Sequence, residues 1–224
     1  MKKDNRTKLS YQVKFVRGIE TIEQLHQWFD VNSQSVGLAF VGRSNVGKSS
    51  LLNGLFGSHV AHVSKSPGRT RQINIFEFSL PEDHDTKFFV IDLPGYGHAH
   101  VSKQTSKSWD YLMSEFFTYL PEKIFLLVIW DARHPEQKMD KEFYQMLKDL
   151  RLDSFLIFNK MDKLKNQKEK SAFKKNFPIL AKKYKKFKLV HFVSAETDEG
   201  MEELVLSLKS NLWKRTLKEA PLPN

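Results

Sequence analysis

The stretch GRSNVGKSS, residues 42–50, places two glycines, a lysine and a serine at the spacing GxxxxGK[ST]. Glycines at 42 and 47 let the backbone turn tightly, so that consecutive N–H groups can point at phosphate oxygens. A helix that begins directly after the loop adds the positive end of its dipole. Lys48 would then reach the β- and γ-phosphates of a nucleotide, and the hydroxyl of Ser49 would bind Mg²⁺. The predicted phosphate-binding loop comprises Gly42, Arg43, Ser44, Asn45, Val46, Gly47, Lys48 and Ser49.

The four residues NKMD, 159–162, follow another apolar run and can identify the base. Asp162 can accept hydrogen bonds from N1–H and from the exocyclic amino group of guanine, whereas adenine offers no such pair of donors. Asp162 would select guanine, because adenine would leave its carboxylate without hydrogen-bond donors, and an unpaired polar group in a site without water is costly. Lys160 would lie over the ring, and Asn159 would tie this segment to the phosphate-binding loop. The alternative is an ordinary polar strand end. The predicted base contacts are Asn159, Lys160, Met161 and Asp162.

Further segments would complete a site for the phosphates and a metal. DLPG, 92–95, ends an apolar run, so that Asp92 would hold Mg²⁺ through a water molecule and the Gly95 N–H could meet the γ-phosphate. Thr70 lies in a predicted loop and could close over Mg²⁺ when the γ-phosphate is present. VSA, 193–195, could offer backbone N–H groups to guanine O6. The predicted nucleotide contacts in these segments are Gly68, Arg69, Thr70, Arg71, Gln72, Asp92, Leu93, Pro94, Gly95, Val193, Ser194 and Ala195; the predicted metal contacts are Ser49, Thr70 and Asp92.

Short apolar runs that alternate with helix-length segments would position these residues. The continuous runs read as strands covered on both faces of a parallel sheet, and they lie at 36–42, 87–93, 124–131, 154–160 and 188–195. INIFEFSL, 73–80, alternates instead, as an edge strand does. Helices are predicted at 48–56, about 102–119, 137–150, 166–184 and 199–215. Repeated strand–helix units predict a doubly wound α/β fold.

The N-terminal segment differs from the repeated pattern. Ile22, Leu25, Trp28 and Phe29 are spaced to form one face of a short packing helix. The predicted divisions of the chain are an N-terminal extension at 1–35, a single domain at 36–217 and a C-terminal tail at 218–224.

Charge is distributed unevenly along the chain. Residues 163–188 hold eleven lysines and one acid, Glu169, so the net charge of this segment is +10. The net charge of the whole sequence is also +10. Clustered lysines can neutralise the phosphates of a nucleic acid. The alternative is a solvated helix face that keeps the protein soluble.

Composition excludes several classes of protein. The chain has no cysteine, which excludes a disulfide framework and a thiolate metal site. The longest apolar run, 124–130, is too short to cross a bilayer, and the N-terminus lacks the apolar core of a signal peptide. We therefore expect a cytoplasmic protein that makes no membrane contact.

The predicted segments, taken in order, resemble a known family. GRSNVGKSSLLN, SPGRTRQIN, DLPGYG, NKMD and VSA look like the five signature elements of a small GTPase. The amino-acid sequences of the first three are similar to those of the bacterial EngB (YihA) family of ribosome-biogenesis GTPases, within the TrmE-Era-EngA-EngB-Septin-like superfamily. The match covers about 36–200, although the family more often has TKxD than NKMD.

The resemblance implies a fold and an activity. The fold would be a Ras-like P-loop domain with a six-stranded, mostly parallel sheet, one antiparallel edge strand and helices on both faces. The activity would be Mg²⁺-dependent hydrolysis of GTP to GDP. The expected partner is the large ribosomal subunit or its precursors, with a role in assembly of that subunit and in normal cell division and septation. We expect a monomer.

Tyr96 stands where Ras-like enzymes carry a glutamine that orients the attacking water. Tyrosine has no amide, so either hydrolysis is slow or another group supplies the catalytic charge. Superfamily members with asparagine at the fourth loop position use it to bind K⁺ beside the phosphates, and the resemblance places Asn45 there. The alternative is that Asn45 only suits a tight turn. The predicted catalytic residues are Asn45, Lys48 and Thr70, and no role is assigned to His98 or His100.

Two classes of function therefore stay open from the sequence. The first is a GTPase switch, in which the bound nucleotide controls docking on ribosomal particles. The second is a nucleotide-binding scaffold with negligible hydrolysis, whose role is to bind RNA or protein.

Overall fold

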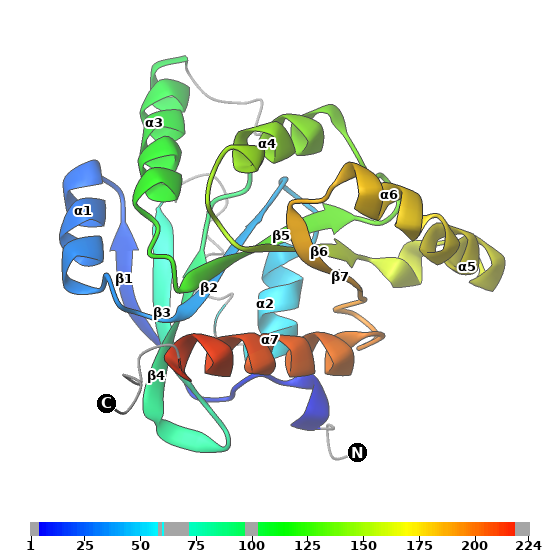
Figure 1. Ribbon diagram of the computed structural model, residues 1–224, viewed down its shortest axis with the longest axis horizontal. Coiled ribbons are helices and arrows are strands. Elements are labelled where there is room, and N and C mark those ends of the chain that lie inside the picture. The colour runs from blue at the N-terminus through cyan, green and yellow to red at the C-terminus, as the bar shows by residue number, and fades with distance from the viewer. Residues whose placement is uncertain (1–4, 58–59, 61–71, 97–102, 218–224) are drawn as a thin grey trace, which may run out of the picture.

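In the computed structural model, which describes residues 5–57, 60, 72–96 and 103–217, seven strands form one sheet (Figure 1). In sheet order the strands are β1 (Val13–Ile19), β3 (Ile73–Leu80), β4 (Asp83–Asp92), β2 (Gly37–Gly42), β5 (Ile124–Asp131), β6 (Ser154–Asn159) and β7 (Phe187–Phe192). Strand β3 runs antiparallel to both of its neighbours, and the pairs from β4 to β7 are all parallel. The α/β prediction is confirmed.

Helices cover both faces of the sheet, as predicted, and each face has its own apolar core. Helices α1 (Ile22–Val31), α3 (Lys103–Tyr119) and α4 (Lys138–Lys148) contribute to one core. Helices α2 (Lys48–Phe56) and α7 (Met201–Thr216) contribute to the other (Figure 1). Central strands β2, β5 and β6 are buried along their whole length, which explains their continuous apolar sequences.

The predicted six-stranded sheet was one strand short. Strand β1 pairs with β3, so β1 forms the sheet edge and the antiparallel strand β3 lies inside it. Most side chains of β1 are exposed, including Lys14 and Arg17, and this exposure removes the apolar signal of a core strand. The adjoining helix α1 was predicted correctly, with Leu25, Trp28 and Phe29 buried.

The predicted helix at 166–184 is two helices. Helix α5 (Gln167–Lys175) has Asn176 as its C-cap, and the same residue is the N-cap of α6 (Phe177–Lys183), which carries Pro178 in its first turn. Proline has no N–H to continue the hydrogen bonds of a preceding helix, and it suits a helix start. Strand β7 is also shorter than predicted, because it ends at Phe192 and leaves 193–195 in the following loop.

The parallel strands point their carboxyl ends at one edge of the sheet, where β2, β4, β5 and β6 lead into the predicted site segments. Ligands of open α/β sheets bind beyond these strand ends. None of the described helices is both long enough and apolar enough to cross a lipid bilayer.

Candidate nucleotide-binding site

The loop after β2 contains two residues with a positive φ, a backbone conformation that glycine and asparagine adopt more readily than other residues. Asn45 has a φ of 66° and Gly47 a φ of 90°, and α2 begins at Lys48 directly after them. A Cβ on Gly42 would lie 2.6 Å from the carbonyl oxygen of Ile129, so a side chain there would displace β5. The loop therefore leads into the free N–H groups of the first turn of α2, as a phosphate cradle requires.

Asn159 joins three segments that are distant in sequence. Its Nδ2 donates to the carbonyl oxygens of Val46 and Gly47, each at 3.2 Å. Its Oδ1 accepts from the N–H of Ala195 at 3.3 Å. The side chain is almost fully buried. The structure thus brings together the predicted phosphate loop, the NKMD segment and the VSA segment.

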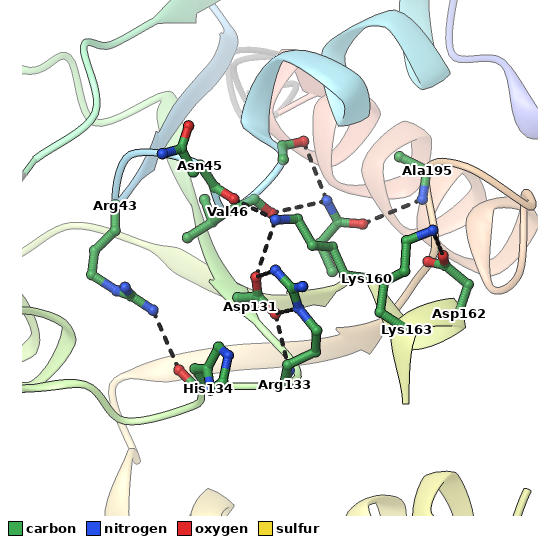
Figure 2. Close-up of polar contacts among 12 residues, drawn as sticks. Arg43, Asn45, Val46, Asp131, Arg133, His134, Lys160, Asp162, Lys163 and Ala195 are labelled. Carbon is green, nitrogen blue, oxygen red and sulfur yellow. Dashed lines mark hydrogen bonds and ion pairs between the residues drawn. The ribbon is translucent and has the colours of Figure 1, made fainter. Parts of the chain in front are cut away.

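Lys160, at φ 66°, extends its side chain to the same loop. Its ammonium contacts the carbonyl oxygen of Asn45 and lies 3.1 Å from Oδ2 of Asp131 (Figure 2). Burial tends to raise the pKa of Asp131, but hydrogen bonds from Arg133 and Lys160 lower it to about 2. Asp131 is therefore a fixed negative charge that orients Lys160.

Sequence reasoning missed Asp131 as a site residue. The available signal was its position as the last residue of β5, a central strand whose carboxyl end faces the site.

Asp162, the predicted guanine contact, is held ionised by its neighbours. The Ser194 hydroxyl donates to its Oδ1 at 2.6 Å, and Nζ of Lys163 lies 2.9 Å from its Oδ2. Burial tends to raise the pKa of Asp162, but these two contacts keep it below the usual range. Met161, buried beside it, donates its N–H to the carbonyl oxygen of Val193 at 3.1 Å. A carboxylate that stays ionised can accept two donors from a base.

Two of the three predicted metal residues, Ser49 and Asp92, lie around the start of α2. The ammonium of Lys48 contacts the Asp92 carboxylate, which is buried at the end of β4, whereas Ser49 is exposed in the first helical turn. Hydroxyl and carboxylate oxygens are ligands that Mg²⁺ takes, usually with phosphate oxygens and water in the remaining positions. The described residues contain no cluster of three His, Cys, Asp or Glu. Ser49 and Asp92 offer oxygen ligands of the kind that Mg²⁺ takes beside nucleotide phosphates.

The DLPG segment packs against the phosphate loop. The N–H of Leu93 donates to the carbonyl oxygen of Phe40 at 3.1 Å, which continues the pairing of β4 with β2. Pro94 follows, and a Cβ on Gly95 would lie 3.0 Å from the hydroxyl oxygen of Ser44. The predicted γ-phosphate contact, Gly95, is thus placed directly beside the loop.

Several predicted residues lie elsewhere or cannot be placed. Gln72 donates to Asn74 Oδ1 at 2.9 Å at the start of β3. The predicted contacts Gly68, Arg69, Thr70 and Arg71 lie outside the described residues, as do His98 and His100.

The lysine-rich segment is only partly available to a partner. Five of its lysines form ion pairs within the chain: Lys163, Lys170, Lys174, Lys183 and Lys188. Lys186 contacts a backbone carbonyl instead. The exposed lysines that have no ion pair with another described residue are Lys165, Lys168, Lys175, Lys182 and Lys185. About half of the predicted basic charge is therefore free to meet phosphates.

Comparison with known proteins places this geometry in a family. A family profile described as "50S ribosome-binding GTPase" matches residues 37–160. The probable GTP-binding protein EngB of Thermotoga maritima is 39% identical over 179 residues, which cover 79% of this chain and 86% of that protein. The protein of the same name from Petrotoga mobilis is 35% identical over 201 residues, 88% of this chain and 94% of that protein.

Solved structures show the same fold. A crystal structure of a probable GTP-binding protein engB superposes with a TM-score of 0.56 at 24% identity, over 82% of this chain and all of that chain. Era in complex with MgGDPNP and nucleotides 1506–1542 of 16S ribosomal RNA gives a TM-score of 0.60 at 26% identity, over 85% of this chain and 58% of that chain.

Proposed function

We propose that this chain, which belongs to the EngB family of GTP-binding proteins, is a Mg²⁺-dependent GTPase whose bound nucleotide controls its association with the large ribosomal subunit or its precursors. The observation that carries the proposal is the placement of Asn159, which joins the phosphate loop to both base segments through three hydrogen bonds. One side chain thereby fixes the distance between a phosphate cradle and a guanine-selective carboxylate.

Binding of GTP would exchange contacts that the chain makes internally. Lys48 would transfer its ammonium from Asp92 to the β- and γ-phosphates, and Asp92 and Ser49 would then hold Mg²⁺. The metal supplies neutralisation of charge on the β- and γ-oxygens. Asp162 would accept the two guanine donors while the VSA segment faces O6. The N–H of Gly95 would meet the γ-phosphate, and Thr70 would close over the metal.

Hydrolysis would depend on positioned charge rather than on a side-chain base. The Tyr96 hydroxyl is engaged by Asp140, so this side chain does not orient water as a glutamine would. Lys48 and the loop N–H groups would stabilise the transition state. We propose slow turnover by the isolated protein, with K⁺ as a further source of charge beside Asn45.

The K⁺ proposal predicts a difference between salts. The Asn45 side chain is exposed, and the positive φ at this residue also suits asparagine as a turn former. Glycine tolerates the same φ but has no amide to bind a cation. We expect the wild type to hydrolyse GTP at least tenfold faster in KCl than in NaCl, a gain of roughly 1.4 kcal/mol in transition-state binding. Asn45→Gly should lose that difference. Equal rates for the wild type in the two salts would remove K⁺ from the account.

Ribosome binding is proposed from the family description and from charge. The matching profile is named for 50S ribosome binding, and the related Era structure contains a ribosomal RNA segment. Lys168 and Lys175 are seven residues apart, about two turns, so they lie on the same face of α5, and both are exposed. They could neutralise RNA phosphates when the protein docks. A role in subunit assembly, and through it in cell division, follows from this partner.

Co-sedimentation with purified large subunits tests the switch. We expect binding with a non-hydrolysable GTP analogue and weak binding with GDP, at low and at moderate salt. Lys168→Gln combined with Lys175→Gln should weaken binding and its salt dependence, whereas Lys138→Gln on α4 should not. Binding that ignores the nucleotide and disappears with salt would instead support the scaffold alternative.

A further inference from the structure

A buried carboxylate on α4 lies between two parts of the nucleotide site. Asp140 is fully buried, and Nε of Arg43 donates to its Oδ1 at 2.9 Å and to its Oδ2 at 3.0 Å. The Tyr96 hydroxyl donates to the same Oδ1 at 3.0 Å. The backbone N–H of Gln137, the helix cap, donates to Oδ2 at 3.2 Å. Both carboxylate oxygens are therefore satisfied, as a buried charge requires.

These contacts join three separate segments. Arg43 belongs to the phosphate loop, Tyr96 directly follows the DLPG segment, and Asp140 lies in the first turn of α4. Arg43 also donates to the carbonyl oxygen of His134 at 3.3 Å, which ties the loop to the segment before α4 (Figure 2). Its guanidinium is thus directed at α4.

Tyr96 is fixed by its ring and backbone as well as by its hydroxyl. Its ring stacks on Phe143 of α4, with centroids 4.9 Å apart and planes inclined by 17°. Its N–H donates to the carbonyl oxygen of Gly42 at 3.2 Å, and its own carbonyl oxygen accepts from the N–H of Ser44 at 3.0 Å. Burial and the neighbouring carboxylate raise the pKa of Tyr96 well above its usual range, so the hydroxyl remains a donor.

The consequence concerns the residue before Tyr96. Gly95 packs against Ser44, and its N–H is the group that we propose to meet the γ-phosphate. Tyr96 is held by contacts of its ring, its hydroxyl and its backbone. Gly95, which directly precedes it, therefore has little freedom to move away from the phosphate loop. GDP lacks the γ-phosphate, so placement of this N–H matters for GTP alone.

We infer that Asp140 is a positioning residue for γ-phosphate recognition, which holds Tyr96, and through it the Gly95 N–H, against the loop that Arg43 anchors. The inference rests on the proposed function, since it needs the chain to bind GTP and GDP at this site. It assigns to α4 a part in distinguishing the two nucleotides, although α4 contributes no residue to the predicted contacts.

Tyr96→Phe tests the inference with little disturbance, because phenylalanine keeps the stack on Phe143 and loses only the hydroxyl donor. Titration calorimetry on the full chain would give dissociation constants for GDP and for a non-hydrolysable GTP analogue. We expect the analogue to bind roughly fivefold to tenfold more weakly and GDP to change by less than about twofold. Asp140→Asn should show the same selective loss, and larger. Glu142→Gln, an exposed change on the same helix, should alter neither constant.

Loss of both affinities by the same factor in Tyr96→Phe would show a merely structural contact and overturn the inference. No loss for the analogue would overturn it too. If Asp140→Asn does not fold, the phenylalanine variant still decides the question. A wild type that binds neither nucleotide would refute the proposed function itself. A wild type that binds both nucleotides, together with a Tyr96→Phe variant that shows no selective loss of the analogue, would overturn only the inference.

Discussion

Lys48→Ala is expected to lower the single-turnover rate of GTP hydrolysis by about a thousandfold or more, because its ammonium is the positive side chain that we place at the β- and γ-phosphates. Phosphate release from GTP under single-turnover conditions, with enzyme in excess, measures the effect. Lys214→Ala, at an exposed lysine of α7, serves as the matched control and should keep the wild-type rate.

The same substitution has a second effect that must be separated from the first. Lys48 contacts the buried Asp92 carboxylate, so its removal leaves that charge without its partner. We expect the free energy of unfolding to fall by roughly 1–3 kcal/mol, which thermal unfolding of the same preparation would show. A folded Lys48→Ala variant that hydrolyses GTP within about tenfold of the wild-type rate would contradict the role of Lys48.

Asp162→Asn should change which base the protein binds. The side-chain amide of asparagine repels the amino group of guanine, but it can donate to the C2 carbonyl of xanthine while its oxygen accepts from N1–H. We expect GDP affinity to fall by about a hundredfold or more, roughly 3 kcal/mol, and xanthosine diphosphate affinity to rise. Asparagine still offers Oδ1 to the Ser194 hydroxyl, so the local fold should persist.

Competition of the two diphosphates against a labelled guanine nucleotide would measure this exchange of preference. Asp149→Asn, at the exposed C-terminal cap of α4, makes the same chemical change away from the site and should leave both affinities unaltered. If Asp162→Asn binds GDP as tightly as the wild type, the base lies elsewhere and the guanine assignment of NKMD is wrong.

The backbone of the candidate nucleotide site was predictable where a local conformation requires particular residue types. Gly47 has a positive φ and no room for a Cβ beside Asn159. This position therefore favours glycine, and the loop could be identified from the sequence pattern alone. The central strands were predictable because burial on both faces makes them continuously apolar.

Other features depend on contacts that no local pattern records. Arg43 and Asp140 are 97 positions apart in the chain, and nothing near either residue indicates the other. Strand β1 is identified by its pairing with β3 rather than by its own mostly exposed side chains. The break between α5 and α6 did have a local signal in Pro178, which the helical pattern around it concealed.

We place the hydrolysis of guanine nucleotides at the site built by Lys48, Asp92, Asn159 and Asp162. Phosphate release by the wild-type protein with Mg²⁺ and KCl, from GTP and from ATP in parallel and in the presence of large ribosomal subunits, tests it most directly. We expect release from GTP at a rate at least about a hundredfold above that from ATP, because adenine leaves the Asp162 carboxylate unpaired. Equal rates from the two nucleotides, or no release from GTP, would contradict it.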